Sequence, residues 1–325
     1  MRRPRLLVIG TSKDPHVDAV IRHFGGDGFF RLDVDRFPRE IRLTLRPKRG
    51  AKPQVIAEEP RATHDLSEVK AVWFRRIGSL SIDPGIRNDA HRSFAFGEAE
   101  ALLFGLAHVL EGATWVSPFD ATRRASSKPF QLQQALSCGL LIPQTVITNS
   151  PKRARSFLED KDAPIFKTIH SPSIKYEDRR ALVFSQRVDA ESLRRLDQLR
   201  FAPGIFQEYV DKSYELRITL VGEKLFPVAI DSQECPEGAV DWRAAPRDAL
   251  KYHSVSLPQN FRVRLEKFIS RLDLRYAAID VIVTPKDEHV FLEVNPHGAW
   301  LWLEQLLDLP ISASVANLLS RYAGR

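Results

Sequence analysis

Residues 276–295 contain two apolar runs, YAAIDVIVT and HVFLEVN, separated by the polar tetrapeptide PKDE. Two strand-length runs on either side of a short polar turn are typical of a β-hairpin in a protein core. Each run carries one carboxylate among its apolar residues, and a hairpin centred on PKDE places Asp280 directly opposite Glu293. The chain therefore has to fold so that a core hairpin can hold two facing carboxylates.

The second strand adds an amide to this pair. Because side chains alternate along a strand, Phe291, Glu293 and Asn295 are predicted to share one face, with Phe291 opposite Ile282. Cross-strand carboxylates about 5 Å apart repel each other unless a cation lies between them. Mg²⁺ binds a few protein oxygens together with nucleotide phosphates, so Asp280, Glu293 and Asn295 form a candidate magnesium site. The register alone leaves open a solvated face or pairing with an arginine.

Composition excludes several classes of protein. The 325 residues are 43% hydrophobic, enough for two or three small domains, and no apolar run approaches the roughly 20 residues of a membrane span. The first residues lack the pattern of a signal peptide, so we expect a cytoplasmic protein that does not enter a membrane. Cys138 and Cys235 lie far apart without a CxxC motif, which predicts reduced structural thiols.

The net charge of +7 is compatible with nucleic acid, with an anionic membrane surface, and with acidic small molecules or peptides as partners, and charge alone does not choose among them. The arginines and lysines are dispersed along the chain, and no zinc finger, aromatic RNA-binding signature or basic heptad region is present. Nucleic acid is therefore not the expected partner.

The first third of the chain reads as alternating strands and helices. RLLVIG (5–10) predicts a strand, and the following segment a helix with Asp14 as N-cap and Pro15 in its first turn. A second strand at 71–76 and a helix over 98–112 extend this α/β pattern. We expect domain boundaries near residues 120 and 210, giving domains 1–120, 121–210 and 211–325.

The middle of the chain alternates helices with β-branched runs. Helices are expected before Gly139 and from Ser150 onward, strands at 145–148, 163–169 and 181–187, and a hairpin that turns at Gly222. The polar segment SPSIKYEDRR (171–180) between two of these strands predicts a mobile loop suited to a lid.

Taken together, the motifs resemble those of one enzyme superfamily. Asp280 with Glu293-x-Asn295-Pro296 is similar to the C-terminal metal site of ATP-grasp carboxylate–amine ligases. NPHGAWLWLE (295–304) resembles a segment of the graspetide (microviridin-type) peptide-cyclising ligases, although Ala299 stands where glutamine is usual. Further similarities, in the same order as in that family, are WFRRIG (73–78), 127–151, 207–222, DSQ (231–233) and DWR (241–243).

The resemblance implies an ATP-grasp fold: a Rossmann-like pre-ATP-grasp domain of α/β type, then two α+β subdomains that clamp ATP. It also implies roles for single residues. Lysines are suited to phosphate, carboxylates to ribose hydroxyls and metal, and guanidinium groups to charge that develops on a phosphoryl group. The implied sets are Lys128 and Lys167 for phosphate; Gln207, Glu208, Tyr209 and Val210 for the connector beside adenine; Glu215 for ribose; Arg217, Arg243 and Asp231 for catalysis; and Asp280, Glu293 and Asn295 for Mg²⁺. Trp300 and Trp302 are expected in the core.

The implied activity is ATP-dependent ligation. An Asp or Glu side chain of an acidic, ribosomally made precursor peptide would become an acyl phosphate, and a hydroxyl or amine of the same peptide would close a macrolactone or macrolactam. The resemblance also implies a homodimer. A RimK-type or small-molecule ligase that joins an external amino acid or amine to a carboxylate is the nearest alternative. A non-catalytic ATP- or peptide-binding module is the alternative from another class.

Overall fold

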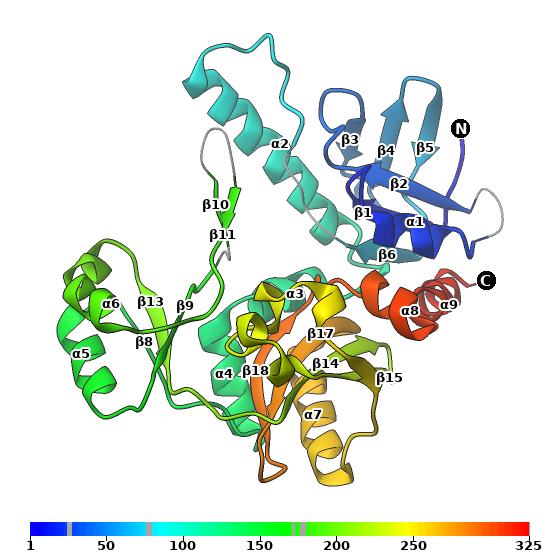
Figure 1. The fold of residues 1–325 in the computed structure, drawn as a ribbon. Coiled ribbons are helices and arrows are strands. Elements are labelled where there is room, and N and C mark those ends of the chain that lie inside the picture. Colours follow the sequence, from blue (N-terminus) through cyan, green and yellow to red (C-terminus); the bar gives the residue numbers. More distant parts are fainter. Residues whose placement is uncertain (25–27, 76–79, 171–172, 176–179, 325) are drawn as a thin grey trace.

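A computed structural model of the chain describes residues 1–24, 28–75, 80–170, 173–175 and 180–324. Its helices and strands form three units, each built on its own sheet (Figure 1). In the described part of the chain, no helix is long and apolar enough to cross a membrane. Cys138 and Cys235 are buried free thiols, as predicted.

The first unit is built on a parallel sheet with the strand order β2-β1-β6-β7. Its strands are β1 (Leu6–Gly10), β2 (Phe29–Asp33), β6 (Ala71–Phe74) and β7 (Thr114–Val116), with helix α1 (Pro15–Ile21) after β1. Asp14 caps α1 and Pro15 opens it, as predicted. The sequence did not indicate the second, antiparallel sheet of this unit: β3 (Arg42–Arg46), β4 (Gln54–Glu59) and β5 (Ala62–Asp65).

Helix α2 (Asp89–Val109) begins nine residues before the predicted start at 98. Asn88 caps it by accepting a hydrogen bond from the backbone of His91. The first turns of α2 project into solvent, where exposed side chains carry no apolar periodicity that would have indicated a helix (Figure 1). Phe94, in this projecting half, is 71% exposed.

The central unit has a small antiparallel sheet with the order β12-β9-β13-β8. Its elements are β8 (Thr145–Thr148), α5 (Pro151–Glu159), β9 (Ile165–Lys167), β12 (Gln186–Arg187), α6 (Ala190–Arg194), the 3₁₀ segment Leu196–Phe201 and β13 (Gly204–Gln207). The predicted lid segment contributes β10 (Ser173–Lys175) and the start of β11 (Arg180–Leu182), which pair as a hairpin. Residues 171–172 and 176–179 of that segment lie outside the described residues.

The C-terminal unit is a five-stranded antiparallel sheet with the order β16-β15-β14-β17-β18. Its strands are β14 (Tyr214–Val221), β15 (Lys224–Ile230), β16 (Tyr252–Ser254), β17 (Tyr276–Val283) and β18 (His289–Asn295). The β14–β15 hairpin turns at Gly222, which has a positive φ of 61°. The α/β and α+β character of the predicted fold class agrees with these three sheets.

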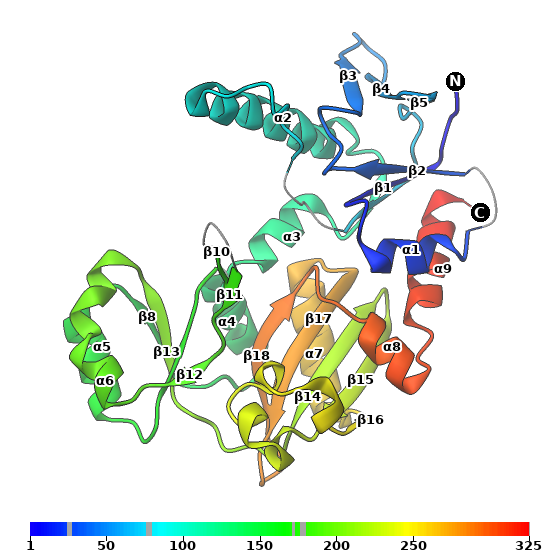
Figure 2. The ribbon, with the colours of Figure 1, turned by 45° about the horizontal axis from the view of Figure 1, so that its top comes forward.

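Several helices connect the units (Figure 2). Helix α4 (Lys128–Ser137), which follows α3 (Phe119–Ala125), shares a core with α7 (Gln259–Leu272) and the C-terminal sheet. After α8 (Leu301–Leu307), helix α9 (Ile311–Ala323) packs against α1, β1 and β6 of the first unit. The three-domain division therefore remains a prediction, because these helices pack on a unit other than the one that precedes them in sequence.

Candidate active site

The facing carboxylates lie in the β17–β18 pair. Asp280 and Glu293 are partners in the register of the two strands, as predicted. Beyond them the register shifts, and Phe291 pairs with Val281 instead of the predicted Ile282. The prediction was wrong there because β18 carries one extra residue, Leu292, which forms a β-bulge.

The bulge also separates side chains that simple alternation would place on one face. Phe291 is fully buried and packs on Phe268 of α7, with 4.9 Å between ring centroids. Leu292 and Glu293 both line a cavity on the other side of the sheet. A bulge next to a site re-aims a side chain, and here it directs the Glu293 carboxylate into the cavity.

This cavity has a volume of about 790 Å³, in the range of small-molecule sites. Residues from all three units line it, so it lies at their junction. Of the predicted site residues, the wall contains Lys128, Lys167, Glu215, Arg243, Asp280, Glu293 and Asn295.

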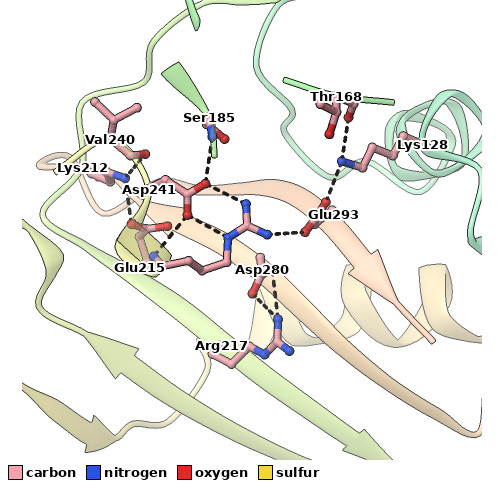
Figure 3. Close-up of polar contacts among 11 residues, drawn as sticks. Lys128, Thr168, Ser185, Lys212, Glu215, Arg217, Val240, Asp241, Asp280 and Glu293 are labelled. Atoms are coloured by element: carbon pink, nitrogen blue, oxygen red, sulfur yellow. Dashed lines mark hydrogen bonds and ion pairs between the residues drawn. The ribbon is translucent and has the colours of Figure 1, made fainter. Parts of the chain in front are cut away.

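Asp280 is held from within the C-terminal sheet. Nη1 of Arg217, on the neighbouring strand β14, donates to both carboxylate oxygens of Asp280 at 2.8 and 3.0 Å (Figure 3). Both residues are buried. Burial and the charge of Glu293 raise the pKa of Asp280 even though Arg217 opposes them. A further cation next to Asp280 would therefore favour the charged form of this carboxylate.

Glu293 is held by cations from other segments. Its Oε2 lies 3.2 Å from Nζ of Lys128 on α4, and its Oε1 lies 3.7 Å from Nη1 of Arg243 (Figure 3). Burial alone would raise the pKa of Glu293, but Lys128, Arg243 and Lys167 lower it. The three cations around Glu293 therefore favour its charged form.

Asp241 is a site residue to which the sequence analysis assigned no role. Its buried carboxylate accepts hydrogen bonds from Nε and Nη2 of Arg243 at 2.8 and 2.7 Å, and from the backbone of Ser185 at 3.1 Å. Although burial works against the charged form, the bonds from Arg243 hold the pKa of Asp241 well below its usual range. This forked pairing fixes the guanidinium plane, and the DWR segment was the signal that pointed to it.

Lys167 lies at the end of β9 and on the wall of the cavity. Burial lowers the pKa of its ammonium group to about 8, against the opposing effect of Glu293. Lys128, across the cavity wall, also donates to the backbone carbonyl of Thr168 at 3.0 Å. Lys128 thus pairs with Glu293 directly and Lys167 acts on the same carboxylate through its charge, an arrangement suited to bridging phosphates.

Glu215 forms the far wall of this polar region. Lys212 donates to its Oε1 at 2.8 Å and to the carbonyl of Val240 at 3.0 Å. Burial raises the pKa of Glu215, and Lys212 lowers it less. Lys212 was not among the predicted site residues, because only the fold reveals its buried position.

Other predicted residues lie elsewhere. In the described part of the structure, the cavity wall does not include Arg217, Asp231 or the four connector residues Gln207, Glu208, Tyr209 and Val210. Arg217 donates to Asp280 instead. Oδ2 of Asp231 lies 3.7 Å from Nδ1 of His253 on β16. Gln207 bonds to Thr145, and Glu208 accepts from the backbone of Gln144 at 2.8 Å, so both tie the connector to the start of β8.

The donor set fits a hard cation that shares its coordination with phosphate. Asp280, Glu293 and Asn295 offer two carboxylates and an amide oxygen. Among the described residues, Oδ1 of Asn295 accepts a single hydrogen bond, from the backbone of His297 at 2.9 Å. Within the described residues, no group of three or more His, Cys, Asp and Glu side chains forms a closed metal cage. The magnesium assignment therefore stays a prediction that depends on phosphate oxygens to complete the coordination.

Comparison with known proteins gives consistent matches across the whole chain. Residues 5–123 match the model of the MvdD pre-ATP grasp domain. A RiPP-associated ATP-grasp ligase from Chryseobacterium gregarium is 30% identical with a TM-score of 0.90, covering 99% of this chain and 97% of its own. The macrocyclase MdnC from Microcystis aeruginosa is 32% identical with a TM-score of 0.87, covering 97% of this chain and 99% of its own. This chain belongs to the RiPP-associated ATP-grasp ligases.

The predicted resemblance and fold class are thus confirmed, and the ligase is an ATP-dependent enzyme of peptide maturation. The ATP-grasp ligase PsnB has the same fold, with a TM-score of 0.81 at 20% identity over 98% of this chain and 99% of its own. No curated protein matches the ligase significantly.

Proposed function

We propose that this ligase cyclises an acidic precursor peptide: it activates an Asp or Glu side chain with ATP and joins it to a hydroxyl or amine of the same peptide. The observation that carries the proposal is the meeting of Lys128, Lys167 and Arg243 around Glu293, opposite Asp280, in one cavity. A carboxylate becomes a good acyl donor only after phosphorylation, and this cluster combines cations for phosphate with carboxylates for a metal.

The residues of the site divide this work. Lys128 and Lys167 would bind the phosphates of ATP, and Glu215 the ribose hydroxyls. Arg243, held in plane by Asp241, would face the charge on the transferred phosphoryl group. Asp280, Glu293 and Asn295 would hold Mg²⁺, which when bound neutralises charge on phosphate oxygens. Arg217 orients Asp280 from behind.

The reaction then needs two displacements. A substrate carboxylate oxygen bonds to the γ-phosphorus and ADP leaves, which forms an acyl phosphate. A hydroxyl or amine of the peptide attacks the acyl carbon, loses its proton, and phosphate leaves. Water would hydrolyse the acyl phosphate, so the site has to be closed during this step. We propose the β10–β11 hairpin as part of that lid.

Relatives support a peptide substrate and these cofactors. The Chryseobacterium gregarium ligase was solved with ADP and a leader and core peptide, MdnC with the precursor peptide MdnA, and PsnB with Mg and ADP. The net charge of +7 supports an acidic peptide. We also propose a homodimer in the cytoplasm, which light scattering and cell fractionation test directly.

The test combines mass spectrometry with an assay for ADP. Incubation with ATP, Mg²⁺ and an acidic peptide should remove one water mass per bond formed and release one ADP for each. Replacing Asp and Glu of the peptide by Asn and Gln is the matched control and should stop both signals. A mass gain that requires added amino acids or amines would establish the RimK-type alternative. No ADP with any peptide or amine would contradict the proposal.

A further inference from the structure

The loop at residues 296–300 follows β18 and forms part of the cavity wall. Side chains hold it at four successive backbone positions. Three donate to carbonyls: Arg75 Nη1 to His297 at 2.6 Å, Tyr276 Oη to Gly298 at 2.6 Å and Arg217 Nη2 to Ala299 at 3.3 Å; the fourth, Nε2 of His16, accepts from the backbone of Trp300 at 3.2 Å. This loop therefore has a defined path without belonging to a helix or strand.

Two of these four contacts come from the first unit. Arg75 directly follows β6, and His16 lies in the first turn of α1. Asp14 connects them: its carboxylate accepts from Nδ1 of His16 at 2.9 Å and lies 3.4 Å from Nε of Arg75. Because Nδ1 donates to Asp14, the lone pair on Nε2 of His16 is free to accept from Trp300.

Asp14 and Arg75 are buried, and His16 beside them is partly buried. Asp14 is 6% exposed and Arg75 is 3% exposed. Burial alone would raise the pKa of Asp14, but the hydrogen bonds from His16 and the charge of Arg75 lower it to about 2. Burying an ion pair adds little net stability, because desolvation offsets the attraction between the charges. The value of such a pair lies in the geometry that it imposes on its neighbours.

The loop leads directly to the candidate metal ligands. The backbone of His297 donates to Oδ1 of Asn295, and Arg217 bonds both to Ala299 and to Asp280. The loop has no slack at Gly298, where a Cβ would lie 2.2 Å from Cβ of Ala278 and 2.9 Å from Nη2 of Arg217. A shift of the loop would therefore displace Asn295 and disturb the Arg217–Asp280 pair.

We propose that Asp14, His16 and Arg75 are positioning residues for ligation: the first unit holds the 296–300 loop and thereby sets the geometry of Asn295 and Asp280. The role of Asn295 and Asp280 in ligation rests on the proposed function. That the first unit holds the 296–300 loop in place does not depend on it. The pre-ATP-grasp unit is thus a structural component of the catalytic centre as well as a neighbour of it.

The test uses Arg75→Gln and Asp14→Asn. Asp14→Asn keeps the shape and the acceptor for His16 but removes the charge that faces Arg75. Arg31→Gln is the matched control, because Arg31 also pairs with buried or half-buried carboxylates of the first unit, Asp33 and Asp18, but does not contact the loop. Hydrogen exchange of the peptide 295–303 is followed without ligands, and ADP release is measured against the Mg²⁺ concentration.

We expect exchange in 295–303 to accelerate at least tenfold in Arg75→Gln and less in Asp14→Asn, with β14 and β17 unchanged. The Mg²⁺ concentration for half-maximal ADP release should rise in the same order, and Arg31→Gln should change neither quantity. Unchanged exchange would overturn the proposal, even if the wild-type protein ligates nothing. Faster exchange with an unaltered Mg²⁺ requirement would overturn the positioning role. Arg31→Gln effects on exchange and Mg²⁺ requirement equal to those of Arg75→Gln would overturn it too.

Discussion

The C-terminal sheet and the central sheet hold the two sides of the same cavity in different ways. The C-terminal sheet has strands of up to eight residues and shares a large core with α4 and α7. The central sheet has strands of at most four residues, and its buried cluster consists of Ala154, Leu158, Leu196, Leu199 and Phe206. Since local stability follows buried apolar contact, we expect the carboxylates to sit on the rigid side and Lys167 on the side that yields more easily.

The same contrast appears within the carboxylate pair. Asp280 is paired inside its own sheet with buried Arg217, whereas Glu293 is paired with Lys128 and Arg243, which are partly exposed. Removing one partner of a buried pair leaves an uncompensated charge, while a partly solvated pair loses little. The two residues should therefore have similar effects on catalysis and different effects on folding.

Asp280→Asn and Glu293→Gln break this comparison most directly. We expect each to lower ADP release with peptide by about a hundredfold or more, since each removes an anionic ligand of the Mg²⁺ that would neutralise the phosphates. Asp280→Asn should also lower the free energy of unfolding by about 3 kcal/mol, whereas Glu293→Gln should change it by less than about 1 kcal/mol. Urea denaturation and a coupled ADP assay measure both quantities.

Asp287→Asn is the control for this pair. Asp287 lies in the turn of the same hairpin with a φ of 61°, a conformation that asparagine tolerates, and its substitution removes the same unit of charge. It should leave ADP release and unfolding near wild-type values. Equal destabilisation by Asp280→Asn and Glu293→Gln would show that the two carboxylates are not held differently.

Two glycines, one in the loop after β18 and one in the central sheet, give a second comparison. At Gly298 an added Cβ would lie 2.2 Å from Cβ of Ala278, an atom fixed by the backbone of β17. At Gly204, in β13, it would lie 2.3 Å from Cε2 of Phe166, the far end of a side chain. We expect Gly298→Ala to cost about 3 kcal/mol and Gly204→Ala about 1 kcal/mol, because only the phenylalanine can move aside. Thermal unfolding of both variants checks the order, and the reverse order would contradict the assignment of rigidity.

The sequence predicted some regions of the fold better than others. In the C-terminal sheet, strong apolar alternation gave the β17–β18 hairpin and the opposition of Asp280 and Glu293. It failed at Leu292, since a bulge adds one residue without a compositional signal. The early start of α2 was missed for a related reason: helical turns exposed on every side show no periodicity.

Within the site, residue types that carry chemistry could be selected, but their supports could not. Two of the supporting residues contact near neighbours: Lys212 bonds to a residue 3 positions away and Asp241 to one 2 positions away. The other two contact distant segments: His16 bonds to a residue 284 positions away and Arg75 to one 222 positions away. The two long-range contacts depend on the packing of the first unit against the 296–300 loop, which no local pattern specifies. Asp231 shows the opposite case, because a motif match selected a residue that the fold places outside the cavity wall.

The smallest expected effect concerns Lys167, on the central side. Its pKa of about 8 means that the free protein holds it mostly charged at pH 7 and mostly neutral at pH 9. Bound phosphate favours the ammonium form and raises its pKa, so binding takes up a proton above pH 8 and weakens as the pH rises. We expect the affinity for ADP to fall about tenfold between pH 7 and pH 9, as measured by calorimetry. Lys167→Arg, which stays charged, should flatten this profile, and a parallel fall in both proteins would assign the titration to another group.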